Sequence, residues 1–309
     1  WANSLFEDNA EYGYGMYLAI NQIRQGLKNT MKEVINSDLD QSCKNALQKW
    51  IENMNNGEGS KEATKNLLSI IKDNKYDDNK LIQEIIEKKD FLVKKSQWIV
   101  GGDGWAYDIG YGGLDHVLAS GEDVNVLVYD TEVYSNTGGQ ASKATPTAAA
   151  AKFAASGKRT RKKDLGMMAM SYGYVYVAQV ALGADMNQTI KAIREAENYD
   201  GPSLIIAYSP CISHGLKEGM GKSVTQEKRA VETGYWHLYR YNPILKENGE
   251  KPFILDSNKP KGSVRDFMMS EIRFTQIQNT FPKIAEKLYD KAEKDAQERY
   301  EIYKELANR

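Results

Sequence analysis

Residues 98–113 read WIVGGDGWAYDIGYGG, an apolar run followed by a segment in which six of the thirteen residues from Gly101 to Gly113 are glycine. An amphipathic run to Leu118 follows, so the pattern predicts a strand, a tight turn around Asp103 and a helix start. Glycine permits close backbone approach, the N–H groups of a helix start attract anions, and an aspartate can hold the metal that phosphate needs. Neither G-x-G-x-x-G nor G-K-[ST] occurs here, which disfavours a dinucleotide site and a P-loop.

A second buried strand, residues 124–129, ends in the loop DTEVYSNTGGQ of residues 130–140. In an open parallel sheet, ligands bind at the carboxyl ends of the strands. Asp103 and the loop from Asp130 to Asn136 can therefore coordinate one metal between them.

The order of elements predicts an α/β fold with a doubly wound parallel sheet, an inserted helical lobe and a helical C-terminal tail. After Met220, proline, glycine and asparagine punctuate a stretch that we expect to cross the surface without building a core. The expected strands are residues 97–100, 124–129, 174–180 and 203–208, with crossover helices at 106–118 and 187–198. The expected divisions are a cleft segment at 1–16, the helical lobe at 17–95, the ligand-binding α/β core at 96–220, and an extended segment with the C-terminal helix at 221–309.

Composition and charge argue against several classes of protein. The chain of 309 residues is 41% apolar and 27% charged, as in ordinary globular proteins, and its net charge of −1 gives no reason to expect nucleic acid or a membrane as partner. No apolar run reaches the length of a membrane span, and no secretory signal begins the chain. The two cysteines cannot build a disulfide framework. We expect a cytoplasmic protein.

Longer phrases carry a family resemblance. The site resembles the thiamine diphosphate motif, in which G-D-G is followed after a spacer by a pair of asparagines; here Asp130-Thr131 replaces the pair. Residues 102–146, with NSLFEDNAEYG at 3–13 and YSPCISHG at 208–215, resemble pyruvate:ferredoxin (flavodoxin) oxidoreductase. The resemblance covers essentially the whole chain and implies the thiamine-binding C-terminal portion. Because that enzyme is several times longer, we expect a fragment, a subunit or one ordered part of a larger protein.

The resemblance implies a set of cofactor ligands. It assigns Mg²⁺ to the Asp103 carboxylate, the Thr131 hydroxyl and the Val133 carbonyl, with diphosphate oxygens completing the shell. By the same resemblance, Gly104 would belong to the cofactor-binding turn, and Asn136 would be the catalytic residue beside the thiazolium and the substrate. From the residues alone, Asp103 could instead cap a helix and Asn136 could be a turn residue.

Two other segments gain roles from the resemblance. The N-terminal segment would line the cofactor cleft through Asn3, Phe6 and Asn9, although it could equally be a polar, capped helix entry. Cys211 would be the last ligand of the [4Fe–4S] cluster nearest thiamine, its three partners lying upstream of this chain in the family. The alternative for Cys211 is a small buried hydrophobe, which is also the expectation for Cys43.

The remaining ionisable residues suggest no further site. The three histidines, His116, His214 and His237, lack metal-ligand spacing and are expected to be structural. The basic run KRTRKK at residues 158–163 is expected to be a solvated loop, with contact to an anionic electron carrier or coenzyme A as the alternative.

The implied function is that of an oxidoreductase of anaerobic metabolism and electron transport. It oxidatively decarboxylates pyruvate to acetyl-CoA and CO₂ and passes electrons through [4Fe–4S] clusters to ferredoxin or flavodoxin. The implied cofactors are thiamine diphosphate, Mg²⁺ and a cluster shared with segments outside this chain. The implied partners are the remaining domains or subunits and coenzyme A, in a homodimer when complete. Two alternatives are a non-redox thiamine-dependent 2-oxoacid decarboxylase, which would not need Cys211, and a catalytically silent assembly module, which would not need Asp103, Thr131 and Asn136.

Overall fold

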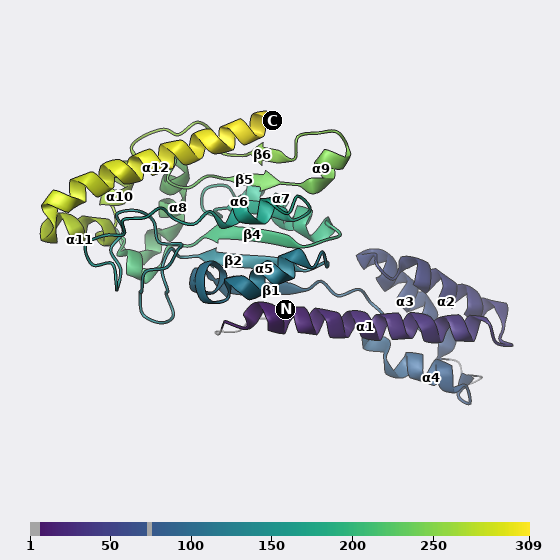
Figure 1. The fold of residues 1–309 in the computed structure, drawn as a ribbon. Helices are drawn as coiled ribbons and strands as arrows, with labels where there is room; N and C mark the ends of the chain where they lie inside the picture. Colours follow the sequence, from purple (N-terminus) through teal and green to yellow (C-terminus); the bar gives the residue numbers. More distant parts are fainter. Residues whose placement is uncertain (1–6, 73–75) are drawn as a thin grey trace. The chain divides into compact units, whose positions relative to one another are not determined.

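The computed structural model describes residues 7–72 and 76–309. It divides into two compact units, one formed by residues up to Gly13 together with Trp98–Arg309, and the other by Tyr14–Gln97. The first unit is an α/β structure and the second is helical (Figure 1).

The α/β unit is built on a six-stranded sheet in the order β1-β2-β4-β3-β5-β6. Its first four strands are parallel, and the α/β fold predicted from the sequence is confirmed. The strands expected from the apolar runs agree with the observed bounds to within two residues at each end. These strands are β1 (Trp98–Gly102), β2 (Asn125–Asp130), β3 (Tyr176–Val180) and β4 (Ser203–Tyr208).

The sheet continues into the stretch that was expected to build no core, so that expectation is wrong. β5 (Tyr239–Tyr241) lies antiparallel to β3, and β6 (Phe253–Leu255) lies antiparallel to β5. Trp236 and Tyr239 are buried there. Each strand has only three residues, too few for a period-two pattern to stand out between turn residues. β5 becomes a strand by pairing with β3, and β6 by pairing with β5.

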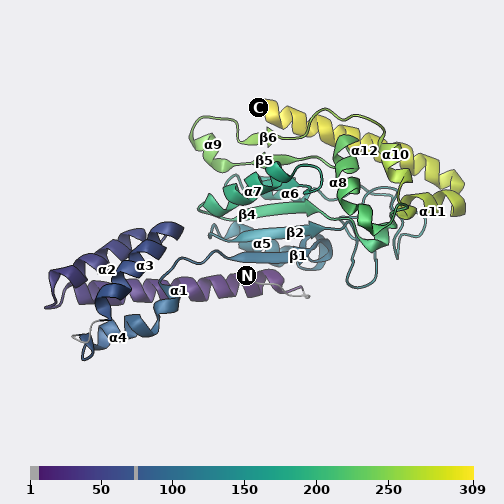
Figure 2. The ribbon, with the colours of Figure 1, turned by 180° about the vertical axis from the view of Figure 1, so that it is seen from behind.

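Helices cover the sheet and form the C-terminal segment. A π-helical segment, Gly104–Ile109, leads into α5 (Tyr111–Ala119), and α7 (Met186–Asn198) packs its alanines against β3 and β4. The C-terminal helix α12 (Pro282–Asn308) packs on β6, as Figure 2 shows from behind. The other helices are α6 (Leu165–Met170), α8 (Ser223–Glu232), α9 (Pro243–Glu247), α10 (Val264–Met269) and α11 (Ile272–Thr280).

The helical unit has its own apolar core. Leu27, Met31, Trp50 and Leu67 are fully buried in it, together with Cys43. Side-chain caps begin three of its helices, with Asp40, Asn56 and Asn79 accepting from backbone N–H groups. Its helices are the part of α1 (Asn9–Ile35) from Tyr14 onward, α2 (Gln41–Asn53), α3 (Gly57–Ile71) and α4 (Lys80–Glu87).

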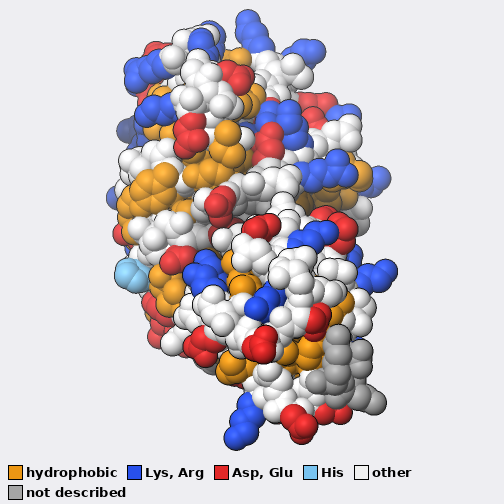
Figure 3. Space-filling model, turned by 90° about the vertical axis from the view of Figure 1, so that its right-hand side faces the viewer, with side chains coloured by type: hydrophobic (Ala, Val, Ile, Leu, Met, Phe, Trp, Pro, Cys, Tyr) orange, Lys and Arg blue, Asp and Glu red, His pale blue; other side chains and the backbone are white. Residues whose placement is uncertain are grey.

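Surface charges are mixed. Figure 3 shows acidic and basic side chains interspersed over the face that it draws, as the net charge of −1 would suggest. Among the described helices, none combines the length and the apolar character needed to cross a bilayer.

Candidate functional site

Three oxygen groups meet where β1 and β2 end. Asp103 directly follows β1 and Thr131 directly follows β2, and the two strands run parallel with Gly102 opposite Tyr129. The Thr131 hydroxyl donates to Asp103 Oδ1 at 2.6 Å and lies 3.1 Å from the Val133 carbonyl oxygen. The structure thus brings together the three groups named as metal ligands in the sequence analysis.

This oxygen cluster lacks a positive charge of its own. Asp103 is 1% exposed, and its Oδ2 atom is buried without a hydrogen-bond partner among the described residues. Burial, and after it the nearby Asp130 carboxylate, raises the pKa of Asp103 to about 7. A bound cation would satisfy the unpaired oxygen and favour the ionised carboxylate. A set of carboxylate, hydroxyl and carbonyl oxygens fits Mg²⁺, which prefers oxygen ligands and near-octahedral geometry.

The turn that carries Asp103 depends on glycine at position 104. A Cβ atom at Gly104 would lie 2.4 Å from Cδ1 of Tyr134, so the loop after β2 packs directly on the turn's backbone. The Asp103 side chain makes no capping hydrogen bond to the π-helical segment that follows. The structure therefore does not support the alternative that Asp103 is a helix cap.

We expect Gly104→Ala to lower the free energy of unfolding by about 1–3 kcal/mol, the usual cost of forcing a methyl group into a packed site. Gly102→Ala is the matched control, because a Cβ atom at Gly102 would meet nothing within 4 Å. Chemical denaturation of the two variants measures the difference. Equal stability of both variants would contradict the packing argument.

A pocket of about 550 Å³ opens beside the oxygen cluster. This volume lies within the roughly 300–1,000 Å³ that is usual for small-molecule and cofactor sites. Tyr129 and Ile109 are exposed and give the pocket an apolar wall. The predicted site residues that line it are Asp103, Gly104, Thr131 and Asn136.

Asn9, which was also predicted to contact the cofactor, lies away from the pocket. Asn9 is fully buried, and its amide donates to the Val100 carbonyl oxygen at 3.0 Å. Asn9 therefore supports β1 and is not among the residues that line the pocket. Asn3 and Phe6 lie outside the described residues.

The end of β4 brings a thiol to the same loop. Cys211 is 7% exposed, and its Sγ atom lies 3.0 Å from Oγ of Ser135, which lines the pocket. Within residues 7–72 and 76–309, no group of three His, Cys, Asp or Glu side chains is arranged to hold a metal. A [4Fe–4S] cluster at Cys211 would therefore need thiolates from outside the described residues.

The basic run at residues 158–163 is only in part the solvated loop that was expected, because Arg159, Thr160 and Arg161 are exposed but Lys162 is not. The Lys162 side chain is 8% exposed and lies 2.7 Å from the Asp130 carboxylate and 3.5 Å from that of Glu132. Opposite charges at this distance stabilise one another most where water is excluded. The acidic partners stand about thirty positions earlier in the chain, so the charge pattern of the run could not indicate its burial.

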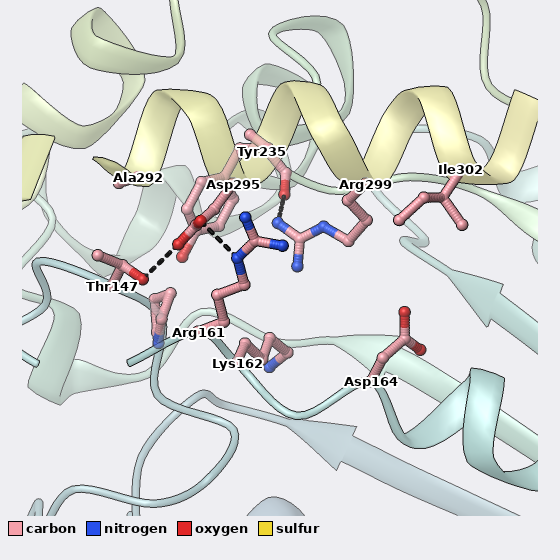
Figure 4. Close-up of a pocket in the computed structure, with 11 residues that line it drawn as sticks. Thr147, Arg161, Lys162, Asp164, Tyr235, Ala292, Asp295, Arg299 and Ile302 are labelled. Carbon is pink, nitrogen blue, oxygen red and sulfur yellow. Dashed lines mark hydrogen bonds and ion pairs between the residues drawn. The ribbon is translucent and has the colours of Figure 1, made fainter. Parts of the chain in front are cut away.

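The same run also lies against the C-terminal helix. Arg161 pairs with Asp295 at 2.6 Å, and the Thr147 hydroxyl donates to the same carboxylate at 2.6 Å. Figure 4 shows this contact between Arg161 and Asp295, and both residues line a cavity of about 180 Å³ that Arg299 of α12 also lines. Helix α12 is thus tied to the segment that supplies Lys162.

Several residues around the loop were not recognised from the sequence. Glu132, Tyr235 and Arg273 are buried and bonded to one another, although Tyr235 and Arg273 stand 103 and 141 positions after Glu132. His214, which was expected to be structural, is fully buried with Nε2 2.7 Å from the Thr131 carbonyl oxygen. Burial lowers the pKa of His214 to about 3, so its ring is neutral.

Comparison with known families agrees with this geometry. Residues 90–207 match the family model described as thiamine pyrophosphate enzyme, C-terminal TPP binding domain. The matched range contains the turn at Asp103 and the loop after β2. The fold and the matched range together define a thiamine diphosphate-binding α/β domain.

Individual proteins are similar to this chain over almost its whole length. The chain is 55% identical to the pyruvate-flavodoxin oxidoreductase of Klebsiella pneumoniae and 55% identical to the pyruvate:ferredoxin oxidoreductase of Moorella thermoacetica, over 99% of its own length in each case. It is 46% identical, again over 99% of its length, to the mitochondrial pyruvate dehydrogenase (NADP(+)) of Euglena gracilis. The chain is therefore similar, over almost its whole length, to one part of the pyruvate:ferredoxin (flavodoxin) oxidoreductases. It spans 26% of the length of the first two relatives and 17% of the third.

Proposed function

We propose that this chain is the thiamine diphosphate- and Mg²⁺-binding part of a larger oxidoreductase. The complete protein would convert pyruvate and coenzyme A to acetyl-CoA and CO₂ and pass the electrons through [4Fe–4S] clusters to ferredoxin or flavodoxin. The observation that carries the proposal is the meeting of the Asp103, Thr131 and Val133 oxygens at two strand ends, with one buried Asp103 oxygen left unpaired. The names of the two relatives at 55% identity support pyruvate as substrate and ferredoxin or flavodoxin as acceptor.

The residues of this chain would hold the cofactor, orient it and shield it. When bound, thiamine diphosphate supplies the nucleophilic carbon and the electron sink that decarboxylation of a 2-oxoacid requires. Asp103, Thr131 and Val133 would hold the Mg²⁺ that neutralises the diphosphate. The Asn136 amide, exposed at the pocket, would orient the substrate. The apolar wall at Tyr129 would exclude water from the reacting atoms.

Cys211 would ligate one iron of a cluster beside this pocket. Its thiol is next to Ser135, on the wall of the pocket, so electrons would have a short path from the cofactor. The same region occurs in a relative named for NADP(+), which supports a role in cofactor chemistry that is independent of the final acceptor. Residues 96–220 would form the cofactor-binding core and residues 17–95 a separate helical lobe, in a protein that is a homodimer when complete.

Each of the two alternative functions leaves one feature of the site unexplained. A non-redox decarboxylase places no demand on a thiol at the edge of the pocket, where Cys211 lies 3.0 Å from Ser135. A silent assembly module would not need a buried carboxylate oxygen without a hydrogen-bond partner, as found at Asp103, because such a group costs stability.

The proposal can be tested by comparing this chain with the full-length protein. The full-length protein should reduce ferredoxin or flavodoxin in a reaction that depends on pyruvate, coenzyme A and thiamine diphosphate. Residues 1–309 alone should not oxidise pyruvate and should bind thiamine diphosphate weakly or not at all, because they represent 26% of the relatives' length. Calorimetric titration in the presence of Mg²⁺ measures the binding. Tight binding by the 309-residue chain, or turnover with an artificial acceptor, would mean that the site is already complete within it.

A further inference from the structure

Glu132 stands between two of the proposed metal ligands in an uncommon backbone conformation. Its φ angle is 58°, in the left-handed region that non-glycine residues rarely adopt. Such a conformation persists only where the surrounding structure imposes it, and it is often found at functional sites. At Glu132 it accompanies a bend of the chain, and the Thr131 hydroxyl lies 3.1 Å from the Val133 carbonyl oxygen.

The side chain and the backbone of Glu132 are both anchored. Its carboxylate is 1% exposed and accepts hydrogen bonds from the Tyr235 hydroxyl at 2.5 Å and from Arg273 Nη2 at 2.8 Å. Its carbonyl oxygen accepts from the Thr145 hydroxyl at 2.6 Å. Polar contacts from three distant segments therefore hold this one residue of the loop.

Arg273 is itself held in place from the C-terminal part of the chain. It is 4% exposed, lies in the first turn of α11, and donates through Nε to Glu271 at 2.6 Å. A buried guanidinium between two carboxylates has little freedom to move, because separation would leave a charge unpaired in a low-dielectric interior. The anchor of Glu132 is thus rigid.

Close packing does not replace these polar anchors. A cavity of about 250 Å³ lies behind the loop, and Glu132, Val133, Thr145, His214 and Arg273 line it. The loop has room to relax on that side if the ion pair is lost. The hydrogen bonds and the ion pair of Glu132 therefore help to fix where Thr131 and Val133 lie, together with the contact of His214 with the Thr131 carbonyl oxygen.

We propose that Glu132, held by Arg273 and Tyr235, is a positioning residue that keeps the Thr131 hydroxyl and the Val133 carbonyl in the geometry that Mg²⁺ requires at Asp103. The inference rests on the proposed function, since it concerns the same metal. Mg²⁺ tolerates little departure from an octahedral arrangement, whereas Ca²⁺ accepts flexible coordination. Loss of the anchor should therefore weaken binding supported by Mg²⁺ more than binding supported by Ca²⁺.

The test measures thiamine diphosphate affinity in the full-length oxidoreductase. Glu132→Gln and Arg273→Met should each raise the Kd with Mg²⁺ roughly 10- to 100-fold, the usual effect of losing an outer partner of a metal ligand. The double variant should lose no more than the more affected single variant, because the two side chains act as one unit. With Ca²⁺ in place of Mg²⁺, the loss should be smaller. An unchanged Kd in Glu132→Gln would overturn the proposal.

A second buried ion pair provides the matched control. Arg240 is 4% exposed and pairs with Glu195 at 2.6 Å and Asp256 at 2.8 Å, but it lines neither the cofactor pocket nor the cavity behind the loop. Arg240→Met should lower thermal stability and leave the Kd unchanged. If Arg240→Met weakened binding as much as Arg273→Met, the effect would be one of general stability and the positioning role would be wrong.

Two further variants separate this inference from the proposed function. Loss of binding in Asp103→Ala together with normal binding in Glu132→Gln would leave the metal site standing and overturn the positioning role. Absence of Mg²⁺-dependent binding in the unaltered protein would overturn both. If Glu132→Gln does not fold, Tyr235→Phe decides the question, because it keeps the ring and removes one hydrogen bond to Glu132. Weaker binding with the same preference for Ca²⁺ supports the proposal, and unchanged binding overturns it.

Discussion

Asp103→Ala should abolish Mg²⁺-dependent binding of thiamine diphosphate in the full-length protein. The Kd should rise by more than about 100-fold, beyond the upper end of what loss of an outer-shell partner costs. The physical reason is that Asp103 supplies the one carboxylate among the three groups that meet at the strand ends. Its buried Oδ2 atom has no other partner among the described residues. Titration of holoenzyme formation measures the effect.

Substitutions at Thr131 provide the control for this result. Thr131→Val removes the hydroxyl that lies 2.6 Å from Asp103, whereas Thr131→Ser keeps it. We expect the valine variant to lose cofactor binding and the serine variant to retain most of it. Circular dichroism should show all three proteins folded. Unchanged affinity in Asp103→Ala would rule out the proposed metal assignment.

Cys211→Ser should remove the iron–sulfur cluster nearest the cofactor and leave thiamine diphosphate binding intact. A cubane cluster needs four thiolates, so losing one should release the whole cluster. Iron content should therefore fall by about four atoms per chain, the number in one [4Fe–4S] cluster. Reduction of the acceptor should fall more than decarboxylation, because the thiol lies beside Ser135 on the pocket wall and not among the oxygen ligands. Iron analysis and separate assays of CO₂ release and acceptor reduction measure these effects.

The second cysteine is the matched control. Cys43 is fully buried in the core of the helical unit, where it packs among apolar side chains. Cys43→Ser should lower stability without changing the iron content. Normal iron and normal acceptor reduction in Cys211→Ser would instead mean that Cys211 is a buried structural thiol.

The parts of the site that could be predicted are those with a local signal. The glycine-rich turn follows an apolar run directly, and the polar loop after residues 124–129 follows another, so both strand ends could be located from the ends of the apolar runs. The parallel order of the sheet then placed Asp103 near Thr131, which the structure bears out with a 2.6 Å hydrogen bond. The longer sequence motifs that resemble the family supplied the hypothesis that the ligands are thiamine diphosphate and Mg²⁺.

The C-terminal third was predicted least well. β5 and β6 have three residues each, too few to show a strand pattern in the sequence. β5 forms on the free edge of β3, and β6 forms on the free edge of β5. The burial of Lys162 depends on Asp130 and Glu132, which stand about thirty positions away. The six charged and polar residues at 158–163 were therefore predicted to form a solvated loop.

The sequence alone determines local features such as turns and strands, because backbone preferences and side-chain types act over a few neighbouring residues. That is why the glycine turn and the four parallel strands could be recognised in the sequence, whereas the proposal of Asp103 and Thr131 as metal ligands came from the family resemblance. The relative positions of these proposed ligands depend on the tertiary structure. Glu132 has a left-handed backbone conformation, and its own carboxylate is bonded to Arg273, which stands 141 positions later. Only the tertiary structure brings the Arg273 guanidinium into contact with this loop.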